Sequence, residues 1–343
     1  QAGPKTRNLR MLFLLLCLLS LWFLLPWLRG PQAAPDRGGR NLTVLLWSWP
    51  FNKPLSLEGD VCWDMSGIPG CRLLSQRSLF STADVVVFHS NELEKQRRAL
   101  PFDLPRPQGQ RWAWMSLEAP AATPDLRRYS NVFNMTVSYR RDADVTIPYG
   151  QLQPRETAAP TDAVPANKTF PVCWVVSNYQ TRHRRSKVFQ ELKAVIPVQV
   201  YGRWSRKPLS AGALLPTISR CYFYLAFENA ISKDYITEKL WRNAYLGGAV
   251  PVVLGPPLKD YQAVAPPRSF IHVDNFTSTR ELALHLRQLA ADQRRYREYF
   301  SWRRDWEVKL FTDWRPRLCA ICSQFSRLPQ HRVYASLHDW VHL

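Results

Sequence analysis

The densest group of polar residues that could do chemistry lies between residues 224 and 239. A strand-like run, Tyr224-Leu-Ala-Phe-Glu228-Asn229, ends in a carboxylate and an amide, and Asp234-Tyr235-Ile-Thr-Glu238-Lys239 follows after a short loop. The second stretch predicts the start of a helix over 235–246. A lysine beside the N–H groups of a helix N-terminus can hold a diphosphate, and a carboxylate there can bind ribose hydroxyls. The spacing fits an ordinary surface Glu-Lys pair equally well.

A second group combines a strand end with a run of cations. Val175-Val-Ser177-Asn178 closes a strand, and Thr181-Arg-His-Arg-Arg185-Ser-Lys187 enters the helix that we expect over 184–193. Basic residues at such a position can cradle phosphate groups. One helix can point only one or two of them at a ligand, so a solvated basic face is the alternative for the rest of the cluster.

Carboxylates form two further candidates. Glu118 follows the apolar run 111–117, and it becomes a candidate general base if it faces a cleft. Asp142-Ala-Asp144 has the spacing of a metal-binding Asp-x-Asp clamp, but the neighbouring Tyr139-Arg-Arg141 competes for its charge. We therefore favour structural ion pairs over a metal there. The histidines and Cys319-x-x-Cys322 lack the spacing of a zinc site.

Short apolar runs must position these groups. The first half of the chain has such runs at 42–47, 84–89 and 111–117, which are typical of buried parallel strands. The second half alternates strands expected at 172–177, 198–201, 222–227, 250–254 and 269–273 with helices expected at 184–193, 235–246 and 279–289. This alternation predicts an α/β protein with two doubly wound domains, joined by a proline-rich linker at 153–170. The ligand would bind in the cleft between them, at the carboxyl ends of the strands.

The N-terminal segment predicts a membrane anchor. Residues 11–28 carry no charge and are rich in leucine. A helix of that length covers about 27 Å, enough for a thin bilayer. We expect a cytoplasmic tail at 1–10, a transmembrane signal-anchor at 11–28 and a stem at 29–40. A cleaved signal peptide is the alternative, although its apolar core usually runs only about 7–15 residues.

The cysteines and sequons favour an oxidising lumen for the rest of the chain. Six of the seven cysteines lie after the anchor, as do N-glycosylation sequons at Asn41, Asn134, Asn167 and Asn275. The chain has 46 Lys and Arg against 27 Asp and Glu, and its net charge of +19 indicates an anionic partner. A luminal body with dispersed basic residues and no nucleic-acid-binding motif argues against nucleic acid as that partner.

Together these motifs resemble those of the animal α-1,3-fucosyltransferases of the Golgi. The matching stretches run in order from residue 49 to 322, across nearly the whole luminal body. They are Trp49-Pro-Phe51, Trp112-Ala-Trp114, Glu118-Ala-Pro120, Tyr139-Arg-Arg-Asp142, Pro148-Tyr-Gly150, Val175-Val-Ser-Asn178, Phe227-Glu-Asn229, Asp234-Tyr-Ile-Thr-Glu-Lys239, Pro251-Val-Val-Leu-Gly-Pro256, Leu310-Phe-Thr-Asp-Trp314 and Cys319-Ala-Ile-Cys322. The short stem and the ending look most like the leukocyte member of the family that forms selectin ligands (sialyl Lewis x).

The resemblance implies a GT-B fold, in which two Rossmann-like domains face a cleft. An acceptor domain at 41–152 and a GDP-fucose domain at 171–312 would be followed by a tail at 313–343 that returns to the acceptor domain. The implied reaction is an inverting transfer of L-fucose from GDP-β-L-fucose to the 3-hydroxyl of GlcNAc in type 2 N-acetyllactosamine, sialylated or neutral. It needs no obligatory metal, although a divalent ion could stimulate it. The implied protein is a single-pass type II Golgi membrane protein that acts on glycoproteins and glycolipids.

The resemblance also implies roles for individual residues. Glu118 would be the catalytic base, Arg185 and Lys239 would neutralise the diphosphate, and Glu238 and Tyr235 would hold the nucleotide. The remaining implied donor-site residues are Tyr149, Val175, Ser177, Asn178, Tyr224, Glu228 and Asn229.

The acceptor side departs from the family pattern. Lys53 stands where some members carry glutamine in the acceptor loop, so it either meets an acidic sugar or is an ordinary surface lysine. Ala119-Pro-Ala-Ala122 replaces the usual Ser-Pro-Ser/Thr-His. Thr123 lies near a position where members active on type 1 chains carry tryptophan, which favours type 2 chains.

The luminal cysteines allow three bridges. Cys173 and Cys221 each begin a donor-domain strand and could pair, as in some relatives. Three pairings are open to the other four cysteines. We favour Cys62–Cys319 with Cys71–Cys322, which would tie the tail to the acceptor domain, because a Cys-x-x-Cys bridge is strained. Local pairs are the alternative.

The sequence leaves two functions open. One is the fucosyltransferase described above. The other is a catalytically inactive, lectin-like Golgi glycan-binding protein that has kept the fold and lost turnover. The presence of Glu118, Arg185 and Lys239 favours the enzyme.

Overall fold

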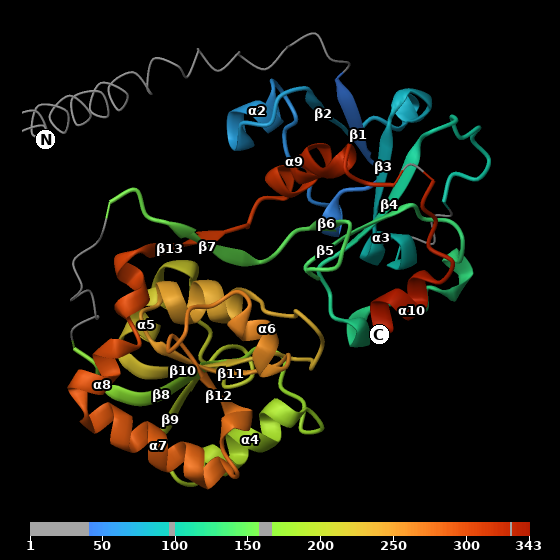
Figure 1. Ribbon diagram of the computed structural model, residues 1–343. Helices are drawn as coiled ribbons and strands as arrows, with labels where there is room; N and C mark the ends of the chain where they lie inside the picture. The colour runs from blue at the N-terminus through green and yellow to red at the C-terminus, as the bar shows by residue number, and fades with distance from the viewer. Residues whose placement is uncertain (1–40, 96–99, 158–166, 330) are drawn as a thin grey trace, which may run out of the picture. The chain divides into compact units, whose positions relative to one another are not determined.

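The computed structural model describes residues 41–95, 100–157, 167–329 and 331–343 (Figure 1). Residues 41–343 form one compact unit. The predicted cytoplasmic tail, transmembrane segment and stem all lie outside the described residues. Within the described ranges, no helix combines the length and the apolar character needed to cross a membrane.

The first sheet has six parallel strands in the order β2-β1-β3-β4-β5-β6. They are β1 (Leu42–Leu46), β2 (Cys71–Leu74), β3 (Val85–His89), β4 (Arg111–Ser116), β5 (Met135–Ser138) and β6 (Val145–Thr146). Every residue of β3 and β4 is buried, since these central strands have packed elements on both faces. With its covering elements, this sheet is called the first lobe below.

Helices from both ends of the chain cover the first sheet. On one face, Val87 and Met115 pack with α2 (Val61–Ser66) and α9 (Trp314–Phe325). On the other face, Phe88 and Trp114 pack with α3 (Ser90–Lys95) and α10 (Leu337–His342). Short 3-10 turns join the strands at Pro50–Asn52, Arg77–Thr82, Pro120–Ala122 and Arg127–Tyr129. The C-terminal segment therefore completes the core of a sheet that is built from the first half of the chain.

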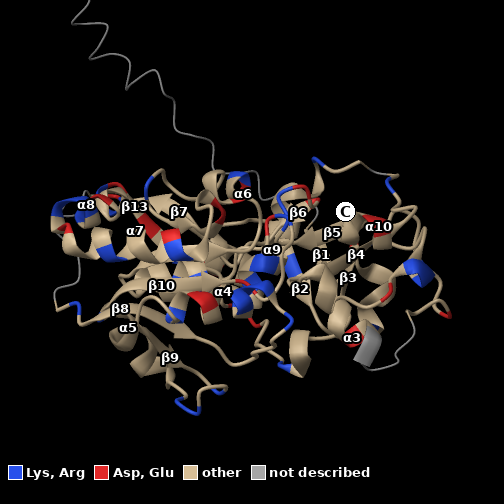
Figure 2. Ribbon diagram, turned by 90° about the horizontal axis from the view of Figure 1, so that it is seen from below, with Lys and Arg blue, Asp and Glu red and all other residues tan. Residues whose placement is uncertain are grey.

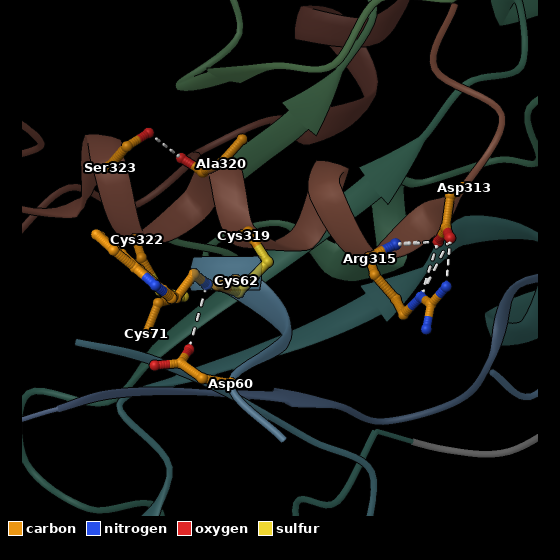
Figure 3. The surroundings of a disulfide bond; sticks show 10 residues. Asp60, Cys62, Cys71, Asp313, Arg315, Cys319, Ala320, Cys322 and Ser323 are labelled. Atoms are coloured by element: carbon orange, nitrogen blue, oxygen red, sulfur yellow. Dashed lines mark hydrogen bonds and ion pairs between the residues drawn. A yellow bond between two sulfur atoms is a disulfide. The ribbon is translucent and has the colours of Figure 1, made fainter. Parts of the chain in front are cut away.

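Two disulfides hold α9 against this sheet (Figure 3). Cys319 bonds to Cys62 in α2, and Cys322 bonds to Cys71 in β2, with Cα–Cα distances of 5.4 and 5.8 Å. Such distances are usual for disulfides. This is the crossed arrangement that we favoured among the three pairings. A third disulfide, Cys173–Cys221, joins two neighbouring strands of the second sheet.

The second sheet has five parallel strands in the order β12-β11-β10-β8-β9. They are β8 (Phe170–Val175), β9 (Val198–Tyr201), β10 (Cys221–Phe227), β11 (Val250–Leu254) and β12 (Ile271–His272). One face packs against α4 (Arg184–Lys193) and α7 (Thr279–Ala291), which is followed by α8 (Gln293–Glu298). The other face packs against α5 (Ala211–Ser219), α6 (Leu258–Gln262) and the π-helix η5 (Lys239–Leu246). Parallel sheets with helices on both faces confirm the predicted α/β class, and this half is called the second lobe.

The chain passes between the lobes as a two-stranded antiparallel ribbon. β7 (Gly150–Pro154) leaves the first lobe, and β13 (Trp306–Leu310) leads back to α9. Gly150 has to be a glycine, because a Cβ atom there would lie 2.6 Å from the Trp241 ring. The domain boundaries expected from the sequence stay a prediction.

Two expected elements differ from the structure. The helix expected over 235–246 is the shorter π-helix η5, which begins only at Lys239, and carboxylates from other elements hold the residues before it in a loop. Asp234 N–H donates to Asp260 and Thr237 N–H donates to Glu228, and Asp234 has a positive φ of 58°. The strand expected over 269–273 is confined to Ile271–His272, since Ser269 is part of a turn in which its N–H donates to Pro266.

Candidate active site

A cavity of about 630 Å³ lies where strands of the second lobe end and residues of the first lobe approach them. Glu118 and Tyr149 come from the first lobe, just after β4 and just before β7. The other lining residues come from the second lobe. Most of the predicted site residues line this cavity: Glu118, Tyr149, Val175, Ser177, Asn178, Arg185, Asn229, Tyr235, Glu238 and Lys239.

A smaller hollow of about 370 Å³ adjoins the cavity. Its own wall includes three aromatic side chains, Phe51, Phe311 and Trp314, and the ring centroids of Phe51 and Trp314 are 6.4 Å apart. Four residues line both spaces: Glu118, Tyr149, Glu238 and Arg242. The two spaces therefore meet at the Glu118 side chain, and a ligand in either would lie beside its carboxylate.

The Glu118 carboxylate is available for proton transfer. In the described part of the chain, no hydrogen bond or ion pair engages it, and the residue is half-buried. Its backbone is held in place, because its N–H donates to Ser116 Oγ at 3.1 Å. Next to it, the Tyr149 hydroxyl donates to the Leu117 carbonyl at 2.6 Å. A base with a fixed backbone and an unengaged carboxylate suits proton abstraction.

Arg185 is the one cation that α4 presents to the cavity. The residue is 6% exposed, and its guanidinium donates to the carbonyls of Asn178 and Phe227. Burial lowers the pKa of Arg185, and its Nε has no hydrogen-bond partner among the described residues. The adjacent Arg184 turns outward and pairs with Asp274. The basic run therefore contributes one buried guanidinium with an unused donor.

Lys239 is held at the cavity by two carboxylates. Its Nζ lies 2.8 Å from Glu228 and 3.3 Å from Glu238. Burial opposes the lysine charge, but these carboxylates outweigh it and raise the pKa of Lys239 to about 12. The Glu228 carboxylate is almost fully buried and also accepts two hydrogen bonds from Thr237. The ammonium group is thus charged and fixed before any ligand binds.

Tyrosines complete the wall. The Tyr235 ring lies between Tyr139 and Tyr149, with centroid distances of 5.1 and 6.2 Å. Burial raises the pKa of both Tyr149 and Tyr235, so both hydroxyls stay protonated at neutral pH. The Tyr149 proton is already donated to the Leu117 carbonyl, so the Tyr149 oxygen can accept a hydrogen bond from a ligand hydroxyl.

Three predicted site residues do not line either space. Tyr224 is fully buried and its hydroxyl accepts from Asn243 Nδ2 at 2.9 Å, and Glu228 lies beneath Lys239. Tyr224 and Glu228 therefore do not face the cavity but hold two residues that do, Asn243 and Lys239. Lys53 is exposed, and neither lining includes it.

Part of the cavity wall was not predicted from the sequence. The missed residues are Val176, Gly202, Arg203, Pro208, Leu209, Leu214, Arg242 and Asn243. Spacing could have found Arg242 and Asn243, since each lies four positions after Glu238 or Lys239 on the same helix. Gly202 lies at the end of β9, where a Cβ atom would come within 2.3 Å of the Val176 carbonyl.

The Asp-x-Asp triplet forms ion pairs. Asp142 pairs with Arg140 and Lys233, each at 2.8 Å, and Asp144 pairs with Arg332 at 2.6 Å. These contacts agree with the ion-pair interpretation. Among the described residues, the one cluster with metal-ligand geometry consists of Cys62, Cys71 and Cys319, all of which are in disulfides.

The four sequon asparagines differ in environment. Asn41, Asn167 and Asn275 are exposed. Asn134 is partly buried, and its side-chain amide accepts from Trp112 N–H and donates to the Arg332 carbonyl. Whether any of them carries a glycan stays a prediction.

Comparison with known proteins gives consistent matches over the whole described part. The family model described as glycosyltransferase family 10 (fucosyltransferase) C-term matches residues 165–340, and that described as fucosyltransferase, N-terminal matches residues 39–150. The chain is 47% identical to alpha-(1,3)-fucosyltransferase 7 of Mus musculus, across 94% of this chain and 81% of the relative. It is 45% identical to the Homo sapiens protein of the same name, across 98% and 97%.

More distant relatives agree. The chain is 40% identical to 4-galactosyl-N-acetylglucosaminide 3-alpha-L-fucosyltransferase 9 of Rattus norvegicus, across 87% of this chain and 81% of the relative. A crystal structure of an alpha1,3-fucosyltransferase with GDP-fucose superposes with a TM-score of 0.55 at 16% identity, covering 87% of this chain and 93% of that one, and so shares the fold. The resemblance seen in the motifs is therefore confirmed. The chain belongs to glycosyltransferase family 10, the fucosyltransferases.

Proposed function

We propose that this fucosyltransferase moves L-fucose from GDP-β-L-fucose to the 3-hydroxyl of GlcNAc in type 2 N-acetyllactosamine, neutral or α2,3-sialylated. The product would be a Lewis x or sialyl Lewis x structure. The names of the relatives support the α-1,3 linkage and an acceptor with a 4-galactosyl-N-acetylglucosaminide unit. The solved structure that shares this fold contains GDP-fucose, which supports that donor.

The observation that carries the proposal is the place of Glu118 where the two spaces meet. The larger cavity would hold the donor and the smaller, aromatic-walled hollow the acceptor sugar. The 3-hydroxyl oxygen of the acceptor would attack C1 of fucose. As it does so, the Glu118 carboxylate would take the proton from that hydroxyl. The bond between C1 and the diphosphate oxygen would break on the opposite face, and GDP would leave with the electron pair. Attack from the face away from the diphosphate converts the β-linked donor into an α-linked product.

The departing diphosphate needs positive charge that is already in place. Arg185 and Lys239 would supply it, because both are positioned by protein contacts in the absence of ligand. Fixed charges of this kind stabilise the developing anion without reorganising during the reaction. Tyr235 and Glu238 would hold the nucleotide, and Tyr149 would line the cleft beside them. With these cations in place the proposed reaction would need no obligatory metal, and a divalent ion could stimulate it.

The protein would act from the Golgi membrane as a single-pass type II protein with a luminal body. Residues 11–28 would be its anchor. Three disulfides in the body support an oxidising compartment.

The test replaces the Glu118 carboxylate with an amide of nearly the same size and shape. Glu118→Gln should bind GDP as the native enzyme does, but its turnover on N-acetyllactosamine should fall about 100- to 10,000-fold, the usual effect of losing a general base. Glu307→Gln is a matched control, since Glu307 is partly exposed and lines neither space. Transfer by Glu118→Gln at the native rate would exclude Glu118 as the base. A native protein that binds glycan and GDP-fucose without turnover would instead support the lectin-like alternative.

A further inference from the structure

Arg141 connects the two lobes at a place outside the active site. It lies in the turn after β5 of the first lobe, and its partners are in the second lobe. Its backbone N–H and its Nε donate to the Asp234 carboxylate at 3.0 and 2.6 Å. Its terminal nitrogen donates to Asp260 at 3.2 Å, and Asp260 also accepts from Asp234 N–H at 3.0 Å.

The two carboxylates depend on this arginine. The Asp234 and Asp260 side chains are only 4% and 2% exposed, whereas the Arg141 side chain is 45% exposed. In the described part of the chain, no other cation lies within ion-pair distance of either carboxylate. A guanidinium can bridge both because its donors diverge from one rigid plane, and an ammonium group has no such fork.

The contact is directly joined to the catalytic wall. Asp234 precedes Tyr235, and Glu238 follows four positions later. Tyr139, two residues before Arg141, packs its ring on Tyr235. The loop at 229–237 leads from β10 to the helix that carries Lys239. The turn at 139–141 therefore holds this loop by one aromatic and one ionic contact. Arg141 itself lines neither the cavity nor the smaller hollow, so it touches no reacting group there.

The loop has separate contacts that preserve its own shape. Asp260 holds Asp234 N–H, and Glu228 holds both Thr237 and Lys239, all within the second lobe. Loss of Arg141 would leave these contacts in place. Without Arg141, the distance between this loop and the first lobe, which carries Glu118, would no longer be fixed by an ion pair.

We propose that Arg141 is a positioning residue that sets the distance between Glu118 and the sugar held by the second lobe. The inference rests on the proposed function, because it assigns Arg141 a part in that reaction. Misplacement of a catalytic group by about 1 Å can cost about 100-fold in rate, whereas binding to one lobe needs no such alignment. Arg141 would therefore affect turnover and leave nucleotide affinity nearly unchanged.

The test compares Arg141→Lys with Lys233→Ala in the otherwise intact protein. Arg141→Lys keeps the charge and loses the fork. Lys233 pairs with Asp142 across the same boundary, but both side chains are well exposed, so its loss should have little effect. The measurements are GDP affinity by calorimetry, kcat at saturating GDP-fucose and N-acetyllactosamine, and hydrogen exchange of residues 229–237.

For Arg141→Lys we expect kcat to fall about 10- to 100-fold while GDP affinity changes by less than about threefold. Hydrogen exchange in the loop should rise. A folded Arg141→Lys with native kcat and native exchange would overturn the inference, as would a loss of kcat that matches an equal loss of GDP affinity or an equal loss in Lys233→Ala.

A variant that does not fold and an enzyme that transfers no fucose can each be distinguished from a failure of the inference. If Arg141→Lys does not fold, Arg141→Gln with Asp234→Asn removes charge from both partners, and native turnover in that double variant would overturn the inference. If the native enzyme transfers no fucose, the proposed function fails. Loop exchange unchanged by Arg141→Lys would then overturn the inference as well, and faster exchange would support its structural part.

Discussion

Removing both disulfides that anchor α9 should cost more stability than the two separate losses together. While Cys62–Cys319 is intact, Cys71–Cys322 closes only a residual ring of about a dozen residues, worth about 3 kcal/mol in the chain-entropy relation. The converse holds for the other bond. Once one bond is gone, the remaining one closes a loop of about 250 residues, worth about 5.5 kcal/mol. The quadruple variant should therefore lose about 8 kcal/mol, against about 6 for two independent losses.

The assay is denaturant unfolding followed by tryptophan fluorescence. The variants are Cys62→Ala with Cys319→Ala, Cys71→Ala with Cys322→Ala, and all four together. Domains are commonly stable by about 5–15 kcal/mol, so each two-cysteine variant should fold, whereas the quadruple variant should stay folded only if the native stability exceeds about 8 kcal/mol. Packing losses from the missing sulfur atoms add up in the quadruple variant, so the excess isolates ring closure.

The Cys173–Cys221 disulfide is the control. It closes a loop of 48 residues inside the two longer loops, worth about 4 kcal/mol, and its loss should add to that of either bond to within about 0.5 kcal/mol. A quadruple variant that loses no more stability than the two pairs do separately would contradict this prediction, as would a two-cysteine variant as unstable as the quadruple variant.

Two further predictions concern single side chains. Arg185→Ala should weaken GDP binding about 10- to 100-fold, because hydrogen bonds to charged groups contribute about 1.5–3 kcal/mol, while Arg184→Ala should change it by less than about twofold; calorimetry that finds equal losses would contradict the assignment. Burial lowers the pKa of His272, whose Nδ1 accepts a hydrogen bond from Asp274 N–H. As the pH falls below about 6.5, His272 therefore becomes protonated in the unfolded chain while it stays neutral in the folded chain. The free energy of unfolding should therefore fall with decreasing pH by up to about 1.4 kcal/mol per pH unit more steeply than in His272→Gln, and identical slopes in denaturant unfolding at pH 7 and 5.5 would argue against it.

The strands and helices that depend on local pattern were predictable. The helix at 184–193 and the strands at 198–201 and 250–254 have the expected bounds, since a buried apolar run or an amphipathic turn is encoded by its own residues. The helix expected from 235 was wrong at its start. Residues 234–237 form a loop instead, held by Asp260 and Glu228, carboxylates that only the folded chain brings to them.

The net charge was a poor guide to the ligand, because many cations of the chain meet their partners only in the folded structure. Figure 2 shows Lys and Arg spread over elements of both lobes, with Asp and Glu among them. Many of these cations pair with neighbouring acids, as Arg184 does with Asp274 and Arg315 with Asp313. A sum over the chain cannot tell a paired surface cation from one that faces a ligand.

The family, the parallel α/β architecture and the set of groups from which a fucosyltransferase site can be built are all readable in the amino-acid sequence. Which of these groups share a cavity wall depends on the tertiary structure. Arg185 enters the cavity and the adjacent Arg184 does not, Glu228 lies below Lys239 as its counter-ion, and Glu118 stands where two spaces meet. The reason is physical: residue type and local period fix what a side chain can do, whereas its direction and its neighbours depend on packing between segments far apart in the chain.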